Sequence, residues 1–270
     1  MRIMRLGPFF AFGLLFSLTA IQAQQAPTPT PASRDVQSVA LLQRSLAALT
    51  GTARVTDVML TGSVTRIAGS QNESGTATLK ATSAGQGRMD LSLPSGQRSE
   101  VTDVSQAGPS GSWSGPDAAW HPVAGHNLYS DLTWFFPAFL ISRILSTPTY
   151  VVSPSDAETK DGTAVEHFAV YEQAAQASAS AKLIESLSRM DIYLDPSTLL
   201  PAAIAFNVHP DNDALTNIPT EIRFANYQNV QGVAVPYHIQ KYIQNGLVLD
   251  VTLSGAQINA GLSGTDFQAQ

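Results

Sequence analysis

Residues 233–253 read VAVPYHIQKYIQNGLVLDVTL, and this stretch decides the fold class. Apolar residues alternate with polar ones over 233–239 and again over 247–253, on either side of Asn245 and Gly246. Alternation with a period of two is typical of a strand with one buried face, and an Asn-Gly pair tolerates the positive φ of a tight turn. The stretch therefore predicts an antiparallel hairpin that turns at Asn245 and Gly246.

The same alternation recurs along the chain, and Gly-, Pro- and Asn-containing breaks separate the segments at intervals that suit hairpins. The alternating apolar positions are Val58, Leu60 and Val64; Ala77, Leu79 and Ala81; Met89, Leu91 and Leu93; Met190, Ile192 and Leu194; Ile204, Phe206 and Val208; and Ile222 and Phe224. Strands with one apolar face that follow each other through tight turns form an antiparallel sheet covered on one side. We expect a mainly β protein of the α+β class, and a parallel α/β architecture is disfavoured.

Three segments are predicted to be helical. Apolar residues at helical spacing run from Asp35 to Leu49, where Ser33 or Asp35 can cap the start and Gly51 the end. A second stripe spans 131–145 and holds Leu132, Phe135, Phe136, Phe139, Leu140 and Ile144, with Asp131 as its cap and Pro137 near a first turn or at a kink. A short helix is expected around 181–187.

The N-terminus has the layout of a secretory signal peptide. Arg2 and Arg5 precede an apolar run over 9–18, and small or polar residues follow, so we expect cleavage after Ala23. An uncleaved N-terminal anchor is the alternative, although the apolar run is about half as long as a membrane-spanning helix. Residues 24–33 read as a flexible Gln/Pro/Thr linker, and 34–270 as a single domain of a periplasmic or secreted protein.

Composition narrows the function classes. The chain has no cysteine, which excludes disulfides, thiolate nucleophiles and cysteine-type zinc sites. Loss of Arg2 and Arg5 with the signal peptide lowers the count of Lys and Arg from 15 to 13 against 21 Asp and Glu, and the net charge moves from −6 to −8. Nucleic acid and anionic membranes are therefore disfavoured as partners. We expect a monomer without an integral membrane span.

Motifs with catalytic or metal chemistry are weak. His121, His126 and Asp131 match no established zinc spacing, and the acids of 209–213 lack the glycine and distal glutamate of a calcium loop. The Gly- and Ser-rich segment 108–115 has no serine in a nucleophile-elbow context, and we interpret it as a turn. We therefore predict no catalytic residues, no metal and no cofactor, and expect that the protein is not an enzyme.

Several local strings resemble one known family. They include 62–66 (GSVTR), 88–91 (RMDL) followed by 94–96 (PSG), 111–113 (GSW), 191–201 (DIYLDPSTLLP), 221–224 (EIRF) with Tyr227, and Ile258 and Asn259 with Phe267. Together with a helix before the first strand and an aromatic helix inserted midway, they resemble the outer-membrane lipoprotein carrier (LolA/LolB-like) superfamily, and most closely its divergent bacterial members. The resemblance spans most of the chain after residue 33.

The resemblance implies a curved antiparallel sheet that forms an incomplete β-barrel, with helices over an apolar concave face. It implies that acyl chains or lipidated proteins bind between helices and sheet, and that an arginine closes the helices over the sheet. Arg66 and Arg88 are the candidates by their position on early strands. The expected apolar ligand site consists of Met89, Leu91, Trp113, Trp134, Phe135, Phe136, Phe139 and Leu140.

Two interpretations of the aromatic segment 134–139 stay open. Its rings either line a cavity for an apolar ligand or pack as an ordinary helix on a sheet, because a closed core and an open pocket use the same residue types. The first interpretation predicts a binding or carrier protein for an acyl chain or a lipidated protein. The second predicts an envelope scaffold or sensor that uses the fold for protein contacts and has no ligand.

Overall fold

A computed structural model of the chain describes residues 32–104, 108–130, 133–155, 158–160, 162–174 and 179–269. The expected signal peptide, most of the expected linker, and Asp131 and Leu132 lie outside the described residues. None of the helices in the described part reaches the length and apolar character that crossing a bilayer requires.

The described residues form one sheet of 14 antiparallel strands. The strands are β1 (Asp57–Ala68), β2 (Gln71–Thr82), β3 (Gln86–Leu93), β4 (Gly96–Asp103), β5 (Ser110–Ser114), β6 (Trp120–Pro122), β7 (Tyr150–Pro154), β8 (Glu158–Lys160), β9 (Thr163–Glu172), β10 (Met190–Leu194), β11 (Pro201–Val208), β12 (Ile218–Val230), β13 (Val233–Ile243) and β14 (Gly246–Ile258). The mainly β, antiparallel prediction is confirmed.

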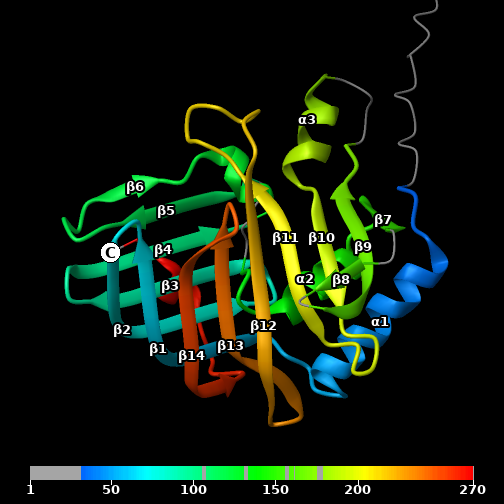
Figure 1. Cartoon of the computed structure of the whole chain (residues 1–270), viewed down its shortest axis with the longest axis horizontal. Coiled ribbons are helices and arrows are strands. Elements are labelled where there is room, and N and C mark those ends of the chain that lie inside the picture. The colour runs from blue at the N-terminus through cyan, green and yellow to red at the C-terminus, as the bar shows by residue number, and fades with distance from the viewer. Residues whose placement is uncertain are drawn as a thin grey trace, which may run out of the picture.

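The sheet is an incomplete barrel. Its strand order is β6-β5-β4-β3-β2-β1-β14-β13-β12-β11-β10-β9-β7, with β8 paired to β9 beside this path, so that β6 and β7 are unjoined edges. The first and last long strands pair with each other in the middle of the sheet. Figure 1 shows the sheet curling from β3–β6 on one side to β9–β12 on the other. The backbone of Ser33 and Asp35 bonds to Val152 and covers the β7 edge.

The hairpin of 233–253 forms with its turn one residue earlier than predicted. Gln244 and Asn245 take the positive φ values of 49° and 65°, and Gly246 is already paired with Ile243. A register shift between Lys241 and Tyr242 accompanies this turn. A bulge adds one residue to one of the two strands. The turn can therefore shift by one residue while the residues farther along the hairpin keep the same buried and exposed faces of the sheet.

Paired apolar residues from neighbouring strands build the concave face. Leu60 lies opposite Leu79 on β2, and Val64 lies opposite Val251 on β14. All four side chains are buried, as are Leu91, Ile192, Ile204, Ile222 and Ile239 on the same face. This continuous layer of side chains is the floor on which the helices pack.

Helix α1 (Val36–Thr50) confirms the first predicted helix. Asp35 accepts a hydrogen bond from the amide of Ser38 as the N-cap, and Gly51 ends the helix at φ 55°. Its buried face differs from the expected apolar stripe, because Val36 is exposed while Ser38 and Ser45 are buried together with Leu42 and Leu49. Helix α1 is in contact with α2 and with strands β7 and β13.

Helix α2 (Pro137–Ser146) begins six residues later than predicted. Pro137 occupies the first helical turn, and Phe136 before it has φ −131° and ψ 86°. A residue that precedes proline is pushed out of the α region by the proline ring, so the helix cannot extend back through Phe135 and Phe136. The prediction of a single helical stripe from Leu132 to Ile144 is therefore wrong for Phe135 and Phe136, which precede the helix.

The remaining described elements are short. Helix α3 (Ala179–Leu187) confirms the third predicted helix, and two turns of 3-10 helix lie at Gly125–Tyr129 (η1) and Gly264–Phe267 (η2). The prediction of a turn over 108–115 is wrong for most of this segment. Residues Ser110–Ser114 form β5 and pair with β4. The backbone ladder overrides the glycine and serine content because β4 offers it an unpaired edge.

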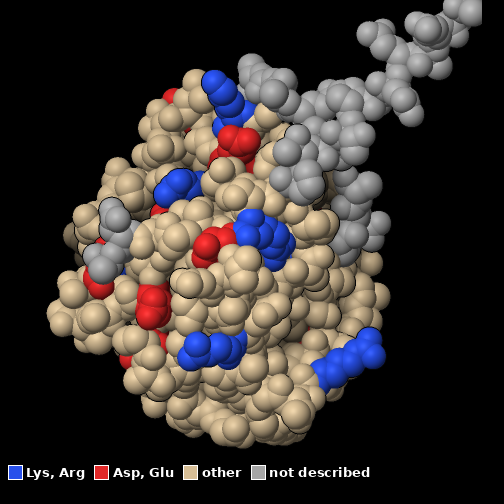
Figure 2. All heavy atoms as spheres, turned by 90° about the vertical axis from the view of Figure 1, so that its right-hand side faces the viewer, with Lys and Arg blue, Asp and Glu red and all other residues tan. Residues whose placement is uncertain are grey.

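Charged side chains on the outer face occur in local pairs. Figure 2 shows basic and acidic groups lying next to one another on a largely uncharged surface, in agreement with a charged fraction of 13%. On the convex side of β8–β12, Lys160 donates to Glu221 at 2.8 Å and lies 4.0 Å from the ring centroid of Tyr193. Arg223 contacts the same Glu221 at 2.6 Å.

The ion pairs of Glu221 with Lys160 and Arg223 should make the free energy of unfolding depend on pH. Burial would raise the pKa of Glu221, but its hydrogen bonds from Lys160 and Arg223 outweigh burial and lower the pKa from 4.5. The stabilisation is thus fully present above about pH 4.5 and is lost as the pH falls through the lower folded-state pKa. We expect Glu221→Gln to reduce the free energy of unfolding by about 1–2 kcal/mol near neutral pH. In urea titrations, the difference in free energy of unfolding between Glu221→Gln and the parent chain should become smaller in acid.

The exposed Glu166 provides the control, since Glu166→Gln removes the same charge from strand β9 of the same sheet. We expect that variant to unfold like the parent chain at both pH values. An equal deficit for Glu221→Gln in acid and at neutral pH would contradict the assigned ion pairs.

Candidate ligand-binding groove

The predicted ligand site is divided between three places. Met89, Leu91 and Trp113 line an open groove on the concave face. Trp134 and Phe135 border a narrow crevice that shares Met89 and Glu100 with this groove. Phe139 and Leu140 line a separate cavity below α2, and Phe136 is buried between these regions with 1% exposure. The eight residues therefore belong to one interior but do not form one pocket.

Strands that are far apart in the strand order, such as β5 and β13, face one another across the groove. Its volume is about 510 Å³, and its lining is mainly apolar. It is lined by residues of 66–69 (β1 and its turn), Met89 and Leu91 (β3), 98–100 (β4), Trp113 and Ser114 (β5), Lys241 and Ile243 (β13), and Val248 and Leu249 (β14). A volume in the range of about 300–1,000 Å³ suits a small ligand.

Trp113 forms the exposed wall of the groove. Its side chain lies on the concave side of β5 because Trp113 pairs with Glu100, and it remains 40% exposed. The ring of His121 lies 4.6 Å from it on the neighbouring strand β6. A large ring that stays exposed beside apolar neighbours can bury further area when a ligand binds.

Charged groups also face the groove, which the alternation of buried residues did not reveal. Arg66, Arg98, Glu100 and Lys241 all contribute to its lining. Arg66 comes two residues after the buried Val64, and Lys241 two residues after the buried Ile239, so both share the inward face of their strands. The sequence contains a signal for this placement. Near the ends of these strands, the charged residues occupy the next inward-facing position after the apolar ones.

Residues 133–135, which include the first two rings of the aromatic segment 134–139, close the inner end of the groove. Trp134 is 5% exposed and lies under the ammonium group of Lys241, with 5.0 Å between the Nζ atom and the ring centroid. Thr133 packs against β3, where a Cβ on Gly87 would lie 3.1 Å from the Thr133 methyl group. The crevice that remains has a volume of about 10 Å³, space for one water molecule at most.

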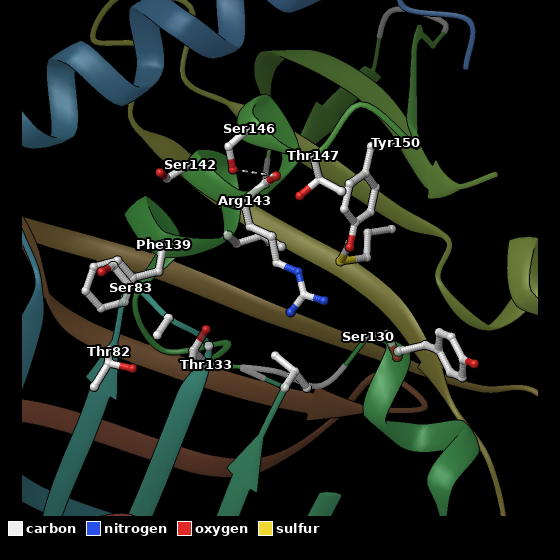
Figure 3. A pocket seen from close by; sticks show the side chains of 16 residues that line it. Thr82, Ser83, Ser130, Thr133, Phe139, Ser142, Arg143, Ser146, Thr147 and Tyr150 are labelled. Atoms are coloured by element: carbon white, nitrogen blue, oxygen red, sulfur yellow. Dashed lines mark hydrogen bonds between the residues drawn. The ribbon is translucent and has the colours of Figure 1, made fainter. Parts of the chain in front are cut away.

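The cavity below α2 has a different chemistry. It measures about 310 Å³ and is lined largely by hydroxyl-bearing residues, among them Ser83, Ser130, Thr133 and Tyr150. Figure 3 shows Arg143 pointing from α2 into this space. Burial raises the pKa of the Tyr150 hydroxyl, while the nearby Arg143 acts in the opposite direction. A polar lining of this kind suits an apolar chain less well than the groove does.

The arginines that the family resemblance nominated do not hold the helices. Arg88 lies on the convex side, where its Nε contacts Asp90 at 2.7 Å and its Nη1 donates to the Gln268 carbonyl oxygen. Arg66 lies at the far end of β1, 3.8 Å from Glu73. Instead, Arg34 donates to the carbonyl oxygens of Ile144 and Thr147 at the end of α2. Sequence reasoning missed Arg34 because it precedes all strands.

The histidines of the weak metal candidates have structural partners. His126 Nε2 is 3.0 Å from the Pro210 carbonyl oxygen, and His209 Nδ1 is 3.1 Å from that of Thr216. Asp213 accepts hydrogen bonds within its own turn, from Leu215 and Thr216, as expected for a loop. Within the described residues, no group of three or more His, Asp or Glu side chains is arranged to hold a metal ion.

Three bacterial proteins are among the solved structures that have a similar fold. One is assigned as an outer membrane lipoprotein-sorting protein domain from Vibrio parahaemolyticus, with a TM-score of 0.56, 14% identity, and coverage of 86% of this chain and 96% of that chain. Another is a LolA superfamily protein from Nitrosomonas europaea, with a TM-score of 0.53, 12% identity, and coverage of 86% and 97%. The chain has the LolA fold.

The third is a DUF1329 family protein from Desulfovibrio piger, with a TM-score of 0.54, 10% identity, and coverage of 88% of this chain and 98% of that chain. No protein-family model matches the sequence, and no curated protein matches it. At these identities the likeness concerns the LolA fold alone, which confirms the curved, incomplete barrel that the resemblance implied.

Proposed function

We propose that this protein is an extracytoplasmic binding or carrier protein whose groove accepts an apolar moiety, an acyl chain either free or attached to a lipidated protein. The observation that carries the proposal is the open, mainly apolar groove of about 510 Å³ on the concave face, with Trp113 exposed at its wall. The site comprises Met89, Leu91 and Trp113, and Trp134 and Phe135 lie at its inner end.

Apolar burial supplies the affinity in this proposal. Each methylene group transferred from water into the groove contributes roughly 0.8 kcal/mol, so a chain of several carbons outweighs the cost of immobilising it. Because the groove is open to solvent, a ligand can enter without unfolding of the sheet. The proposal needs no bond to be made or broken, and it assigns the protein no catalytic residue.

The N-terminal sequence supports the extracytoplasmic location in this proposal. A signal peptide cleaved after Ala23 would deliver the domain to the periplasm or the exterior, where a protein that shields acyl chains from water is needed. The Vibrio parahaemolyticus structure with the same fold is assigned to lipoprotein sorting. These two points support an acyl chain, free or protein-bound, over other apolar ligands.

Binding of a fluorescent fatty acid to delipidated protein tests the proposal. We expect saturable binding, and we expect Trp113→Ala to weaken it about tenfold because the ring's contact with the chain is lost. Trp113 is the better position to change than Phe139, which is 7% exposed and lines the other cavity, so that a polar residue there would disturb the core.

The matched control is Leu215→Ala, which removes a side chain that is 80% exposed on the loop after β11, outside the groove. It should bind like the parent chain. If well-folded parent protein binds no fatty acid, the carrier proposal is wrong and the ligand-free scaffold becomes the better interpretation.

A further inference from the structure

Positive charge gathers at the groove of a protein that is acidic as a whole. The net charge of the chain is −6, yet Arg66, Arg98 and Lys241 line the groove against one carboxylate, that of Glu100. Two further carboxylates lie outside the lining, that of Glu73 at 3.8 Å from Arg66 and that of Asp117 beside Gly115, so the excess of positive charge belongs to the lining itself, with three cations and one anion. An apolar wall with cations at its edge matches the two ends of an anionic amphiphile.

Arg98 is the cation best placed to receive a ligand. It lies on the inward face of β4, opposite Leu91 of β3, so its stem passes the apolar wall. Its Nε atom is buried and has no hydrogen-bond partner. A Cβ added to Gly115 would lie 3.4 Å from the Oδ1 atom of Asp117 and 3.9 Å from both the Nη1 atom of Arg98 and the ring of Trp113, so the guanidinium and the exposed ring both lie near Gly115.

A buried guanidinium nitrogen without a partner is costly, because it has lost its water without gaining an acceptor. A carboxylate can accept two parallel hydrogen bonds from one guanidinium, here from its Nη1 and Nη2 groups, because the Nε atom is covered. Arg66 and Lys241 differ from Arg98 in having neighbours of their own, Glu73 at 3.8 Å and the Trp134 ring at 5.0 Å. Arg66 and Lys241 add positive potential around the position where a carboxylate would bind to Arg98.

We propose that the groove is selective for a single-chain amphiphile with an anionic head, a fatty acid, and that Arg98 binds its carboxylate while the chain lies along Leu91 and Trp113. This inference rests on the proposed function, since it specifies the ligand class of the same groove. The groove's volume of about 510 Å³ suits one chain.

Three ligands with the same chain and different heads test the selectivity: lauric acid, dodecanol and dodecylamine, each in competition with the fluorescent fatty acid and below its micelle concentration. We expect the acid to bind at least about tenfold more tightly than the alcohol, and the amine to bind most weakly. Arg98→Gln should bring the affinity for the acid down to that for the alcohol and leave the alcohol unchanged. Added salt should weaken the acid but not the alcohol.

Arg44→Gln is the matched control, because it removes the same charge from the exposed side of α1, away from the groove. It should leave all three affinities unchanged, and thermal melts should show that both variants fold. Equal affinities for acid, alcohol and amine, or an Arg98→Gln variant that still prefers the acid, would overturn the head-group assignment while leaving the carrier function intact. Failure of all three ligands to bind would overturn the carrier function itself.

Discussion

We expect Phe136→Ala to lower the free energy of unfolding by about 3–5 kcal/mol, as removal of a fully buried aromatic ring does. Phe136 is 1% exposed and meets the Phe139 ring edge-on at 4.8 Å between centroids. It immediately precedes Pro137, so the backbone there is restricted and cannot easily move to fill the space. Urea unfolding followed by circular dichroism measures the change.

Val36→Ala provides the comparison, since Val36 is apolar but 80% exposed at the start of α1. That variant should differ from the parent chain by less than about 0.5 kcal/mol. A loss below about 1 kcal/mol for Phe136→Ala would mean that the ring packs loosely and that the groove extends further toward α2 than the narrow crevice allows.

The second large effect is expected at Gly62, on the central pairing of β1 with β14. A Cβ at this position would lie 2.2 Å from the Thr252 carbonyl oxygen and 2.7 Å from the Leu253 Cα atom. Both are backbone atoms, so no side chain can rotate away, and the two strands would have to separate. We expect Gly62→Ala to cost at least about 2–3 kcal/mol of unfolding free energy in the same urea assay.

The close approach at Gly62 arises from a register shift. Between Thr61 and Gly62 the partner on β14 changes from Gly255 to Leu253, so that Ser254 is the extra residue of a bulge. Gly125→Ala is the control, because a Cβ on Gly125 meets no atom within 4 Å and its φ is not positive. If Gly62→Ala were as stable as Gly125→Ala, this register of the first and last strands would be wrong.

Alternation in sequence predicted the strands well because it reports which face of a strand is buried. The rows that begin at Val58, Met89 and Val233 all lie on the concave face. The helix around the aromatic segment was predicted too long, since apolar rings at suitable spacing cannot reveal that Pro137 starts the helix. Propensity and pattern describe a segment, whereas helix ends depend on a few backbone angles.

The candidate site was predicted in part. Met89, Leu91 and Trp113 line one groove, but the other five predicted residues are buried around the crevice and the second cavity. Which apolar residues fill the interior and which line a space depends on where the sheet curls. The charged members of the groove were missed because, along the sequence, Arg98 and Lys241 look like ordinary surface residues at strand ends.

Local periodicity was enough to predict an antiparallel, one-sided sheet, a capped helix over 35–49 and a short helix around 181–187, which the structure places at 36–50 and 179–187. Three features depend on the tertiary structure: β1 pairs with β14, β6 and β7 stay unjoined, and Arg98 and Trp113 line one groove. These contacts join residues distant in the chain, and their geometry depends on the curvature of the whole sheet, which no local pattern encodes.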